Sequence, residues 1–344
     1  MLPTWVGDAA MATPFLRALR RAMPGATITG FGTRAAGATL NGSDLLDRVR
    51  SYRASDSTWA LAKRLRAGRF DLGILLPNSF RTAAVLRLAG VPRRVGFVRD
   101  GRGWLLTDRA ELPNRNNGPI PQIDYYNALL PTLGIESTSR RMELGITDRE
   151  KQRAAAVLTA SSLDGDLLRP ADDGRPPLVL LNPGGSYGAS KLWPTEHFAA
   201  LADRLAAEWD ATVAVTTAPA ERPIATEIVR LAKSPIYDLA ATGLLNLGAV
   251  KDLCRRADLV VTNDTGTRHL AAAFGSRLIT LFGPTDPRRT TLNFGREIEL
   301  LEPVDCGPCQ LKTCPLPEPE TKKCMKLITP DHVFDAAATL LRRS

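Results

Sequence analysis

The chain has 344 residues, of which 44% are hydrophobic and 24% are charged, and its formal net charge is +9. This composition is typical of a water-soluble globular protein, and the length favours two domains over one. The apolar runs are too short to span a bilayer and the N-terminal residues lack the pattern of a secretory signal, which predicts a cytoplasmic protein.

The basic residues occur in short clusters rather than in one continuous stripe, as at Arg140–Arg141 and Lys322–Lys323. Such charge favours an anionic partner: nucleic acid, a phosphorylated glycolipid or an anionic membrane surface. Aromatic residues make up only 6% of the chain and do not alternate with arginine, which argues against nucleic acid. A charge kept away from zero for solubility alone explains many of these residues equally well.

The first 25 residues predict a turn followed by a long amphipathic helix. Residues 5–9 form the turn, with Asp8 as its only acid, and the helix runs to about Met23. In a doubly wound domain such a turn follows a parallel strand of about 5–6 residues. No apolar strand precedes this turn. We expect either a true start upstream of Met1 or a domain that works without its first strand, and we favour the upstream start.

Short apolar segments then alternate with amphipathic ones. The predicted strands are residues 72–77, 178–182, 213–216, 259–262 and 278–282. The predicted helices are residues 82–89, 196–208, 224–232 and 268–274. Continuous apolar strands separated by helices are typical of parallel sheets that are covered on both faces. The predicted fold class is therefore α/β, doubly wound.

The alternation runs twice, with a break at residues 163–177 that is rich in Asp, Gly and Pro. We interpret the break as an interdomain linker. The prediction is a Rossmann-like domain over residues 1–165, a second over residues 175–330 and a C-terminal helix over residues 331–344. Two such halves facing a cleft form the GT-B architecture. Because that architecture serves both glycosyltransferases and some sugar-nucleotide epimerases, the fold alone does not decide the reaction.

A glycine-rich stretch, "LNPGGSYGASKLWP" at residues 181–194, lies between a predicted strand and a predicted helix. Its glycines allow the backbone to approach a ligand, Ser186 offers a hydroxyl, and Lys191 offers a charge that suits a phosphate. A glycine-rich surface loop explains this stretch equally well when it is considered by itself.

The stretch "VVTNDTGTRHLAAAFG" at residues 260–275 indicates a second phosphate-binding element. A buried strand runs into Asp264, Thr265 and Gly266, where a helix begins, and backbone N–H groups at a helix N-terminus suit a pyrophosphate. His269 falls in the first turn of this helix. The structural alternatives are that Asp264 is a plain N-cap and that His269 is a packed core residue.

Glu221 follows a predicted strand at the start of the next helix. In a Rossmann-like domain an acid at this position commonly accepts hydrogen bonds from ribose hydroxyls. The alternative is that Glu221 stabilises the helix dipole.

Four of the five cysteines fall within 19 residues, as Cys306-x2-Cys309-x4-Cys314-x9-Cys324. A cytoplasmic cluster that opens on Cys-x-x-Cys favours a tetrahedral zinc site over disulfides. The spacing matches no standard zinc ribbon, so reversible disulfides and unligated thiols stay open beside zinc. The fifth cysteine, Cys254, is expected in a buried helix.

In combination and in this order, four stretches resemble glycosyltransferase family 9, the ADP-heptose:lipopolysaccharide heptosyltransferases, and most closely its type II branch. They are "WVGDAAMATPFLRALR", "LPNSFRTAAVLRLAGVPRRVGF", "NPGGSYGASKLWP" and "VTNDTGTRHLAAAFGSRLITLFGPTDP". The resemblance implies a GT-B fold and an inverting transfer of heptose from ADP-L-glycero-D-manno-heptose onto the inner-core heptose of lipopolysaccharide. Family members usually begin with a short apolar strand, in line with the expected upstream start.

The resemblance also implies residue roles. Asp8 is the expected base, which takes the proton of the acceptor hydroxyl. The contacts to the nucleotide sugar that the resemblance implies are Lys191, Glu221, Asp264, Thr265, Gly266 and His269, to which the glycine-rich stretch adds Ser186. Because Lys191 and the N–H groups after Asp264 stabilise the departing pyrophosphate, no cofactor is expected for the chemistry, and zinc at the cysteines would be structural.

An acceptor that carries carboxylates and phosphates gives the basic first half of the chain a role. The candidate acceptor contacts are Asn78, Ser79, Arg81, Arg93 and Arg94. Attraction to anionic lipid would hold the protein at the inner face of the cytoplasmic membrane without an anchor. The expected partners are ADP-heptose, the inner-core acceptor and that membrane surface, with no nucleic acid.

Two other readings of the function remain open. The chain fits another GT-B nucleotide-sugar enzyme, with a different donor sugar or with epimerase activity that needs no acceptor. It also fits a degenerate binding protein that has lost its activity with its first strand. The base, the donor sugar, the acceptor hydroxyl and the oligomeric state do not follow from the residues themselves.

Overall fold

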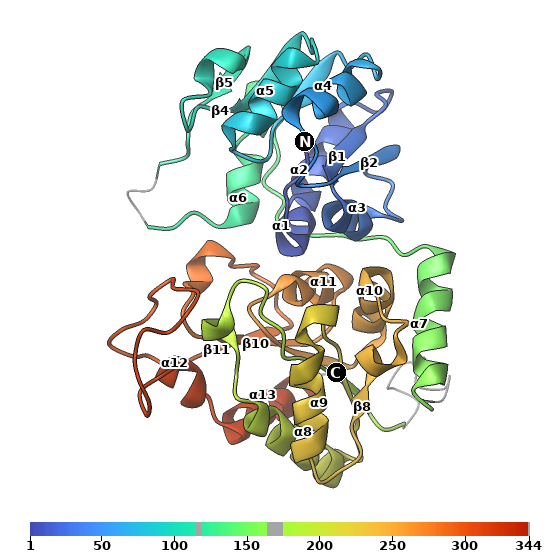
Figure 1. Cartoon of the computed structure of the whole chain (residues 1–344), viewed down its shortest axis with the longest axis vertical. Coiled ribbons are helices and arrows are strands. Elements are labelled where there is room, and N and C mark those ends of the chain that lie inside the picture. The colour runs from blue at the N-terminus through green and yellow to red at the C-terminus, as the bar shows by residue number, and fades with distance from the viewer. Residues whose placement is uncertain (115–117, 164–174, 343–344) are drawn as a thin grey trace. The chain divides into compact units, whose positions relative to one another are not determined.

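The computed structural model describes residues 1–114, 118–163 and 175–342. The chain forms two compact units, Met1–Gly145 with Arg288–Leu292, and Ile146–Pro287 with Asn293–Ser344. Both are α/β with parallel strands (Figure 1), which confirms the predicted fold class. Most of the predicted linker, residues 163–177, lies outside the described residues. Within the described ranges, no helix has the length and apolar character needed to cross a bilayer.

The first unit contains two parallel sheets. One pairs β1 (Thr29–Thr33) with β2 (Arg48–Tyr52), and the other has the order β3 (Leu72–Ile74), β4 (Arg93–Phe97), β5 (Asp108–Ala110). The α-helices of this unit are α1 (Val6–Met11), α2 (Thr13–Ala22), α3 (Arg34–Leu40), α4 (Thr58–Arg66), α5 (Phe80–Leu88) and α6 (Gln122–Asn127).

The first two residues of the chain lie between these two sheets and bond to both. The N–H of Leu2 donates to the carbonyl of Phe31 at 2.9 Å, and the ammonium of Met1 donates to the carbonyl of Ile74 at 2.7 Å. Burial lowers the pKa of the Met1 amine to about 5. Met1 and Leu2 thus take the place of a strand between β1 and β3. Beside them is a cavity of about 730 Å³ lined by residues of α2, β1, β2 and β3.

The opening helix is interrupted, so the single long helix that we predicted is wrong. α1 ends at Met11 and α2 begins at Thr13, because Pro14 has no N–H with which to continue the hydrogen-bond ladder. The first helix also begins earlier than predicted, at Val6, so that Asp8 lies in its first turn. A carboxylate is favourable there because it faces the positive end of the helix dipole.

The second unit is built on a six-stranded parallel sheet of order β11-β10-β9-β6-β7-β8. The strands are β6 (Leu178–Asn182), β7 (Thr212–Val215), β8 (Tyr237–Asp238), β9 (Leu259–Asn263), β10 (Leu278–Phe282) and β11 (Glu297–Leu301). The α-helices are α7 (Asp148–Ala160), α8 (Thr195–Trp209), α9 (Arg222–Leu231), α10 (Leu247–Arg256), α11 (Gly266–Phe274), α12 (Lys323–Lys326) and α13 (Pro330–Arg342). The buried strands β6, β9 and β10 confirm the predicted apolar strands.

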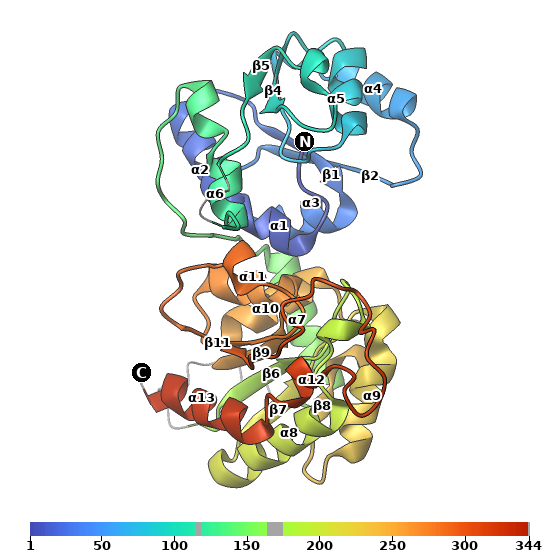
Figure 2. The same ribbon diagram turned by 90° about the vertical axis from the view of Figure 1, so that its left-hand side faces the viewer.

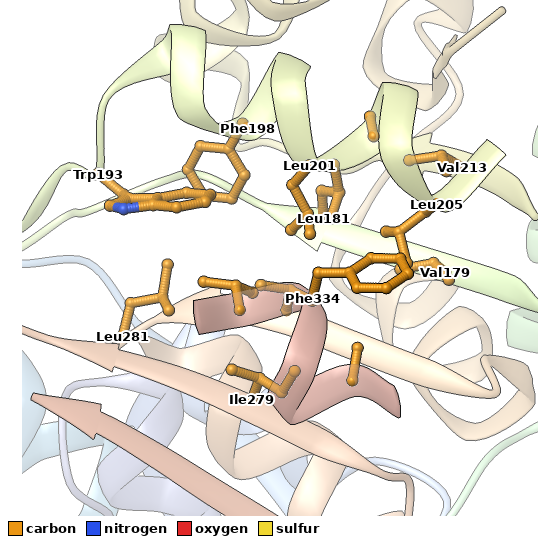
Figure 3. Close-up of a cluster of buried hydrophobic side chains, with 14 of the residues drawn as sticks. Val179, Leu181, Trp193, Phe198, Leu201, Leu205, Val213, Ile279, Leu281 and Phe334 are labelled. Carbon is orange, nitrogen blue, oxygen red and sulfur yellow. The ribbon is translucent and has the colours of Figure 1, made fainter. Parts of the chain in front are cut away.

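Helices cover both faces of this sheet (Figure 2). One core lies between the strands and helices α8 and α13, where Phe198 packs against Trp193 and Leu205 lies beside Phe334 and Val179 (Figure 3). Burying each such side chain contributes about 1.5–3 kcal/mol. Helices α10 and α11 lie on the opposite face. This packing holds the carboxyl ends of β6, β9 and β10 rigidly in place.

Candidate functional site

Three loops meet at one edge of the sheet in the second unit. They follow β6, β9 and β10, which are neighbours in the sheet. Because all three strands are parallel, their carboxyl ends lie at the same edge, where doubly wound folds place their ligands. The structure therefore brings together the two stretches, residues 181–194 and 260–275, that were predicted to bind phosphate.

Lys191 and Asp264 form a buried ion pair at this edge. The Nζ atom of Lys191 donates to Oδ2 of Asp264 at 2.6 Å and to its backbone carbonyl at 2.9 Å, and the hydroxyl of Thr285 donates to the same Oδ2 at 2.9 Å. Burial raises the pKa of Asp264, but the charges of Lys191 and Arg268 outweigh burial and hold that pKa below its ordinary value. The carboxylate is thus ionised and fixes the position of the ammonium.

Arg268, which was not among the predicted site residues, supports this pair. It is fully buried, its Nη1 lies 3.7 Å from Oδ1 of Asp264, and its guanidinium donates to Glu297 at 2.6 Å and to Glu299 at 2.5 Å. The only signal in the sequence was their closeness along the chain, since Asp264 comes just before α11 and Arg268 lies in its first turn.

The N-terminus of α11 opens beside the ion pair. Thr265, not Asp264, is the N-cap residue, and its hydroxyl donates to Oδ1 of Asn182 at 3.2 Å. Gly266 is the first helical residue, so the first N–H groups of the helix have no intrahelical acceptor. Burial lowers the pKa of His269 to about 3, which keeps its imidazole neutral. Its Nδ1 is buried and has no hydrogen-bond partner among the described residues.

The glycine-rich loop after β6 is fastened by two side chains. The N–H of Gly185 donates to Oε1 of Glu221 at 2.7 Å, and a Cβ at Gly184 would lie 2.3 Å from Oε2 of the same carboxylate. The side-chain amide of Asn263 donates to two loop carbonyls at 2.8 and 3.0 Å. Glu221 therefore lies against the loop, while Ser186 is exposed on it.

Asp8 lies in the first unit, half-buried in the first turn of α1. No side chain of the described residues forms a hydrogen bond or an ion pair with its carboxylate. Burial raises the pKa of Asp8 to about 6. Such a carboxylate is a stronger base than an ordinary aspartate and is still ionised at neutral pH, which suits proton abstraction.

Three of the acceptor candidates lie after β3. The amide of Asn78 donates to the hydroxyl of Tyr125 at 2.8 Å and accepts from the buried Arg102 at 3.0 Å. Ser79 is the N-cap of α5, and Arg81 donates to backbone carbonyls of residues 54 and 56. Arg102 was not predicted, because an arginine in the turn "RDGRGW" carries no sign of burial.

Arg93 and Arg94 lie elsewhere. They begin β4, whose first residues pair with the first residues of β3, so they lie at the amino edge of that sheet and Asn78 lies at the carboxyl edge. Arg93 pairs with Asp108 at 2.8 Å, and Arg94 donates to the carbonyls of residues 91 and 105. The structure does not bring these two arginines to Asn78 and Ser79.

The four clustered cysteines carry free thiols and line a single cavity of about 60 Å³. No three His, Cys, Asp or Glu side chains of residues 1–114, 118–163 and 175–342 are placed to hold a metal ion. Cys254 is buried in α10, as predicted.

Known proteins resemble this chain over most of its length. Residues 58–319 match the model of glycosyltransferase family 9 (heptosyltransferase). The chain is 25% identical to lipooligosaccharide heptosyltransferase 2 of Campylobacter jejuni, covering 100% of this chain and 98% of that protein. It is 34% identical to lipopolysaccharide heptosyltransferase 1 of Pseudomonas aeruginosa, covering 77% and 69%. In fold it resembles E. coli ADP-heptose lps heptosyltransferase II, with a TM-score of 0.78, 24% identity and coverage of 99% and 97%.

Proposed function

The chain belongs to glycosyltransferase family 9, and from that premise we propose that it transfers a heptose from ADP-heptose to the inner core of lipopolysaccharide. The observation that carries the proposal is the buried Lys191–Asp264 pair beside the N-terminus of α11. It combines a fixed ammonium with free backbone N–H groups, which is what a departing pyrophosphate needs. The relatives named above supply the class of donor and acceptor.

The second unit is the proposed donor domain. The N–H groups of Thr265, Gly266 and the next residue would bind the pyrophosphate, together with Lys191. As the bond to the anomeric carbon breaks, negative charge grows on the pyrophosphate, and these groups stabilise it in place without a required metal. Glu221 keeps accepting capacity for ribose hydroxyls, Ser186 offers an exposed hydroxyl, and the neutral His269 offers a polar nitrogen.

The first unit is the proposed acceptor domain. Asp8 would take the proton of the acceptor hydroxyl while that oxygen attacks the anomeric carbon, which inverts the configuration there. Asn78, Ser79 and Arg81 follow the carboxyl end of β3 and are the proposed acceptor contacts. The amino-edge position of Arg93 and Arg94 does not support the same role for them.

We expect rapid release of ADP from ADP-heptose only when a heptosylated core acceptor is also present. The reason is that Asp8 requires a hydroxyl to deprotonate, whereas water alone supports only slow hydrolysis. The measurement is ADP release with and without the acceptor. Equally fast conversion of the nucleotide sugar alone would support an epimerase and contradict the proposal.

Peripheral binding to an anionic membrane is a second part of the proposal, supported by the net charge of +9 and by the lipid-linked acceptor. We expect the protein to co-sediment with vesicles that contain phosphatidylglycerol and to dissociate in about 0.5 M salt, which screens exposed charges. Phosphatidylcholine vesicles are the control. Equal binding to both kinds of vesicle would contradict an electrostatic association.

A further inference from the structure

The proposed transfer makes no use of the four cysteines between β11 and α12. Cys306, Cys309 and Cys314 lie in an irregular segment that follows β11, and Cys324 lies in α12. All four line the same small cavity. Residues up to 18 positions apart along the chain are therefore gathered around one point, which the proposed transfer reaction does not require.

The surroundings of this cavity suit metal-bound thiolates. Lys322 and Lys323 line it as well, and although Lys323 pairs with Glu320 at 3.1 Å, both ammonium groups lower the cost of the charge that four thiolates around a divalent ion carry. The backbone N–H of Lys322 donates to Sγ of Cys314 at 3.2 Å, an arrangement that orients a sulfur ligand. The remaining wall includes Pro284, Pro315 and Leu316, which offer no competing side-chain ligand.

The same segment is bonded to the loop that carries Lys191. The hydroxyl of Tyr187 donates to the carbonyl of Gln310 at 2.6 Å, and the hydroxyl of Ser190 donates to the carbonyl of Leu311. The N–H of Ser190 donates to the carbonyl of Lys312 at 3.1 Å. All three acceptors lie between the second and third cysteines, next to the position that a bound ion would fix.

The cysteine segment also packs closely against the loop that carries Lys191. A Cβ at Gly188 would lie 2.3 Å from the carbonyl oxygen of Lys312, so only glycine permits the approach. The N–H of Gln310 donates to the carbonyl of Pro284 at 2.7 Å, which ties the cysteine segment to the loop after β10. The cysteine segment thus forms hydrogen bonds with two of the three loops of the proposed donor site, those after β6 and β10.

We propose that Cys306, Cys309, Cys314 and Cys324 bind one Zn²⁺ ion, and that this ion braces the loop carrying Lys191. Among the described residues no three thiols are placed to hold one ion, so binding requires the four side chains to turn into the cavity that they line, to the Zn–S distance of about 2.3 Å. Four thiolate ligands close the coordination sphere, so the ion is structural rather than catalytic. Binding releases the thiol protons to solvent. The effect on the donor loop rests on the proposed function, but the metal site does not.

The first test measures metal in the full-length protein, purified under reducing conditions without added chelator. We expect one zinc per chain by elemental analysis, and exposure of four additional reactive thiols when a strong chelator removes it. Replacement by Co²⁺ should give the absorption of a tetrahedral thiolate site. Absence of bound metal, two disulfides by mass spectrometry, or iron in place of zinc would each overturn the assignment.

The second test uses the double variant Cys309→Ser/Cys314→Ser, with Cys254→Ala as the matched control because Cys254 lies in α10, away from the cluster. We expect the double variant to lose zinc and to raise KM for ADP-heptose about 10–100-fold, because a loosened loop misplaces Lys191. The control should keep both. Chelation of the unmodified protein, followed by addition of Zn²⁺, should remove and restore donor affinity even if the variant folds poorly.

The two proposals fail in different ways. A protein that holds one zinc but transfers no heptose would refute the proposed function and leave the metal site standing. Normal donor affinity in a folded, zinc-free protein would show that the ion does not brace the loop, and so would overturn that half of the inference.

Discussion

Replacing Asp8 with asparagine is expected to lower kcat for heptose transfer by about 10²–10⁴-fold, the usual contribution of a general base. The affinity for ADP-heptose should stay close to that of the unmodified protein, because the proposed donor contacts all lie in the other unit. Steady-state transfer rates and direct binding of ADP-heptose measure the two effects separately. Normal turnover in the variant would remove Asp8 from the mechanism.

The pH dependence sharpens this test. Since only the ionised carboxylate accepts a proton and the pKa of Asp8 is raised to about 6, kcat/KM of the unmodified protein should rise towards pH 6 and level off above it. Asp8→Asn should abolish that step. Asp44→Asn, a matched change at an exposed acid of the same unit, should keep it.

Replacing Asp8 with asparagine should preserve or raise the thermal stability of the protein although it lowers the rate of transfer. Burial raises the pKa of Asp8, so the folded state binds its proton more tightly than the unfolded chain does. The contribution of Asp8 to stability is therefore lost progressively as the pH rises from the ordinary pKa of 3.8 to about 6, and above pH 6 the carboxylate carries its full cost. The Asp8→Asn variant should unfold at the same or a higher temperature at pH 8, which separates loss of the base from loss of the fold.

Replacing Lys191 with methionine is expected to weaken binding of ADP and ADP-heptose by about 10–100-fold. The estimate follows from the loss of one charge-assisted hydrogen bond, about 1.5–3 kcal/mol. Titration calorimetry with ADP measures the change. Lys233→Met, at an exposed lysine of the same unit, is the matched control and should bind ADP normally. Unchanged ADP affinity in Lys191→Met would exclude its phosphate role.

A double variant separates binding from folding at this position. Lys191→Met alone leaves Asp264 buried without its nearest cation, 2.6 Å away in the native protein, and should lower the free energy of unfolding. Lys191→Met/Asp264→Asn removes the charge as well and should recover part of that stability. It should not recover ADP affinity. Recovery of both would mean that Lys191 acts only through the fold.

The central strands of the second unit were predictable because their apolar runs are continuous and buried on both faces, as in β6 and β9. The edge strands β8 and β11 were not, since they are only half-buried and carry charged residues. Strand β1 was missed for another reason. Its sequence, "TGFGT", contains two glycines and lacks an apolar run, yet it is packed against Leu2.

For the candidate site, the separate motifs could be predicted from the sequence, but the contacts between them could not. Glycines, a lysine and the Asp-Thr-Gly turn marked two phosphate-binding stretches, but nothing in the sequence shows that Lys191 and Asp264, 73 residues apart, would pair with each other. Arg93 and Arg94 were predicted as acceptor contacts from their charge alone, and β4 was not among the predicted strands. Once its strand is known, its direction places them at the amino edge.

The burial of the Met1 amine has a consequence for protein engineering. Its pKa of about 5 leaves it uncharged at neutral pH, and it lies beside a partly open pocket of about 730 Å³. A segment placed ahead of Met1 would start beside this pocket, which is lined by residues of α2, β1, β2 and β3. A polar affinity tag would place unsatisfied groups there, whereas a fusion after the C-terminal helix α13 leaves these sheets undisturbed.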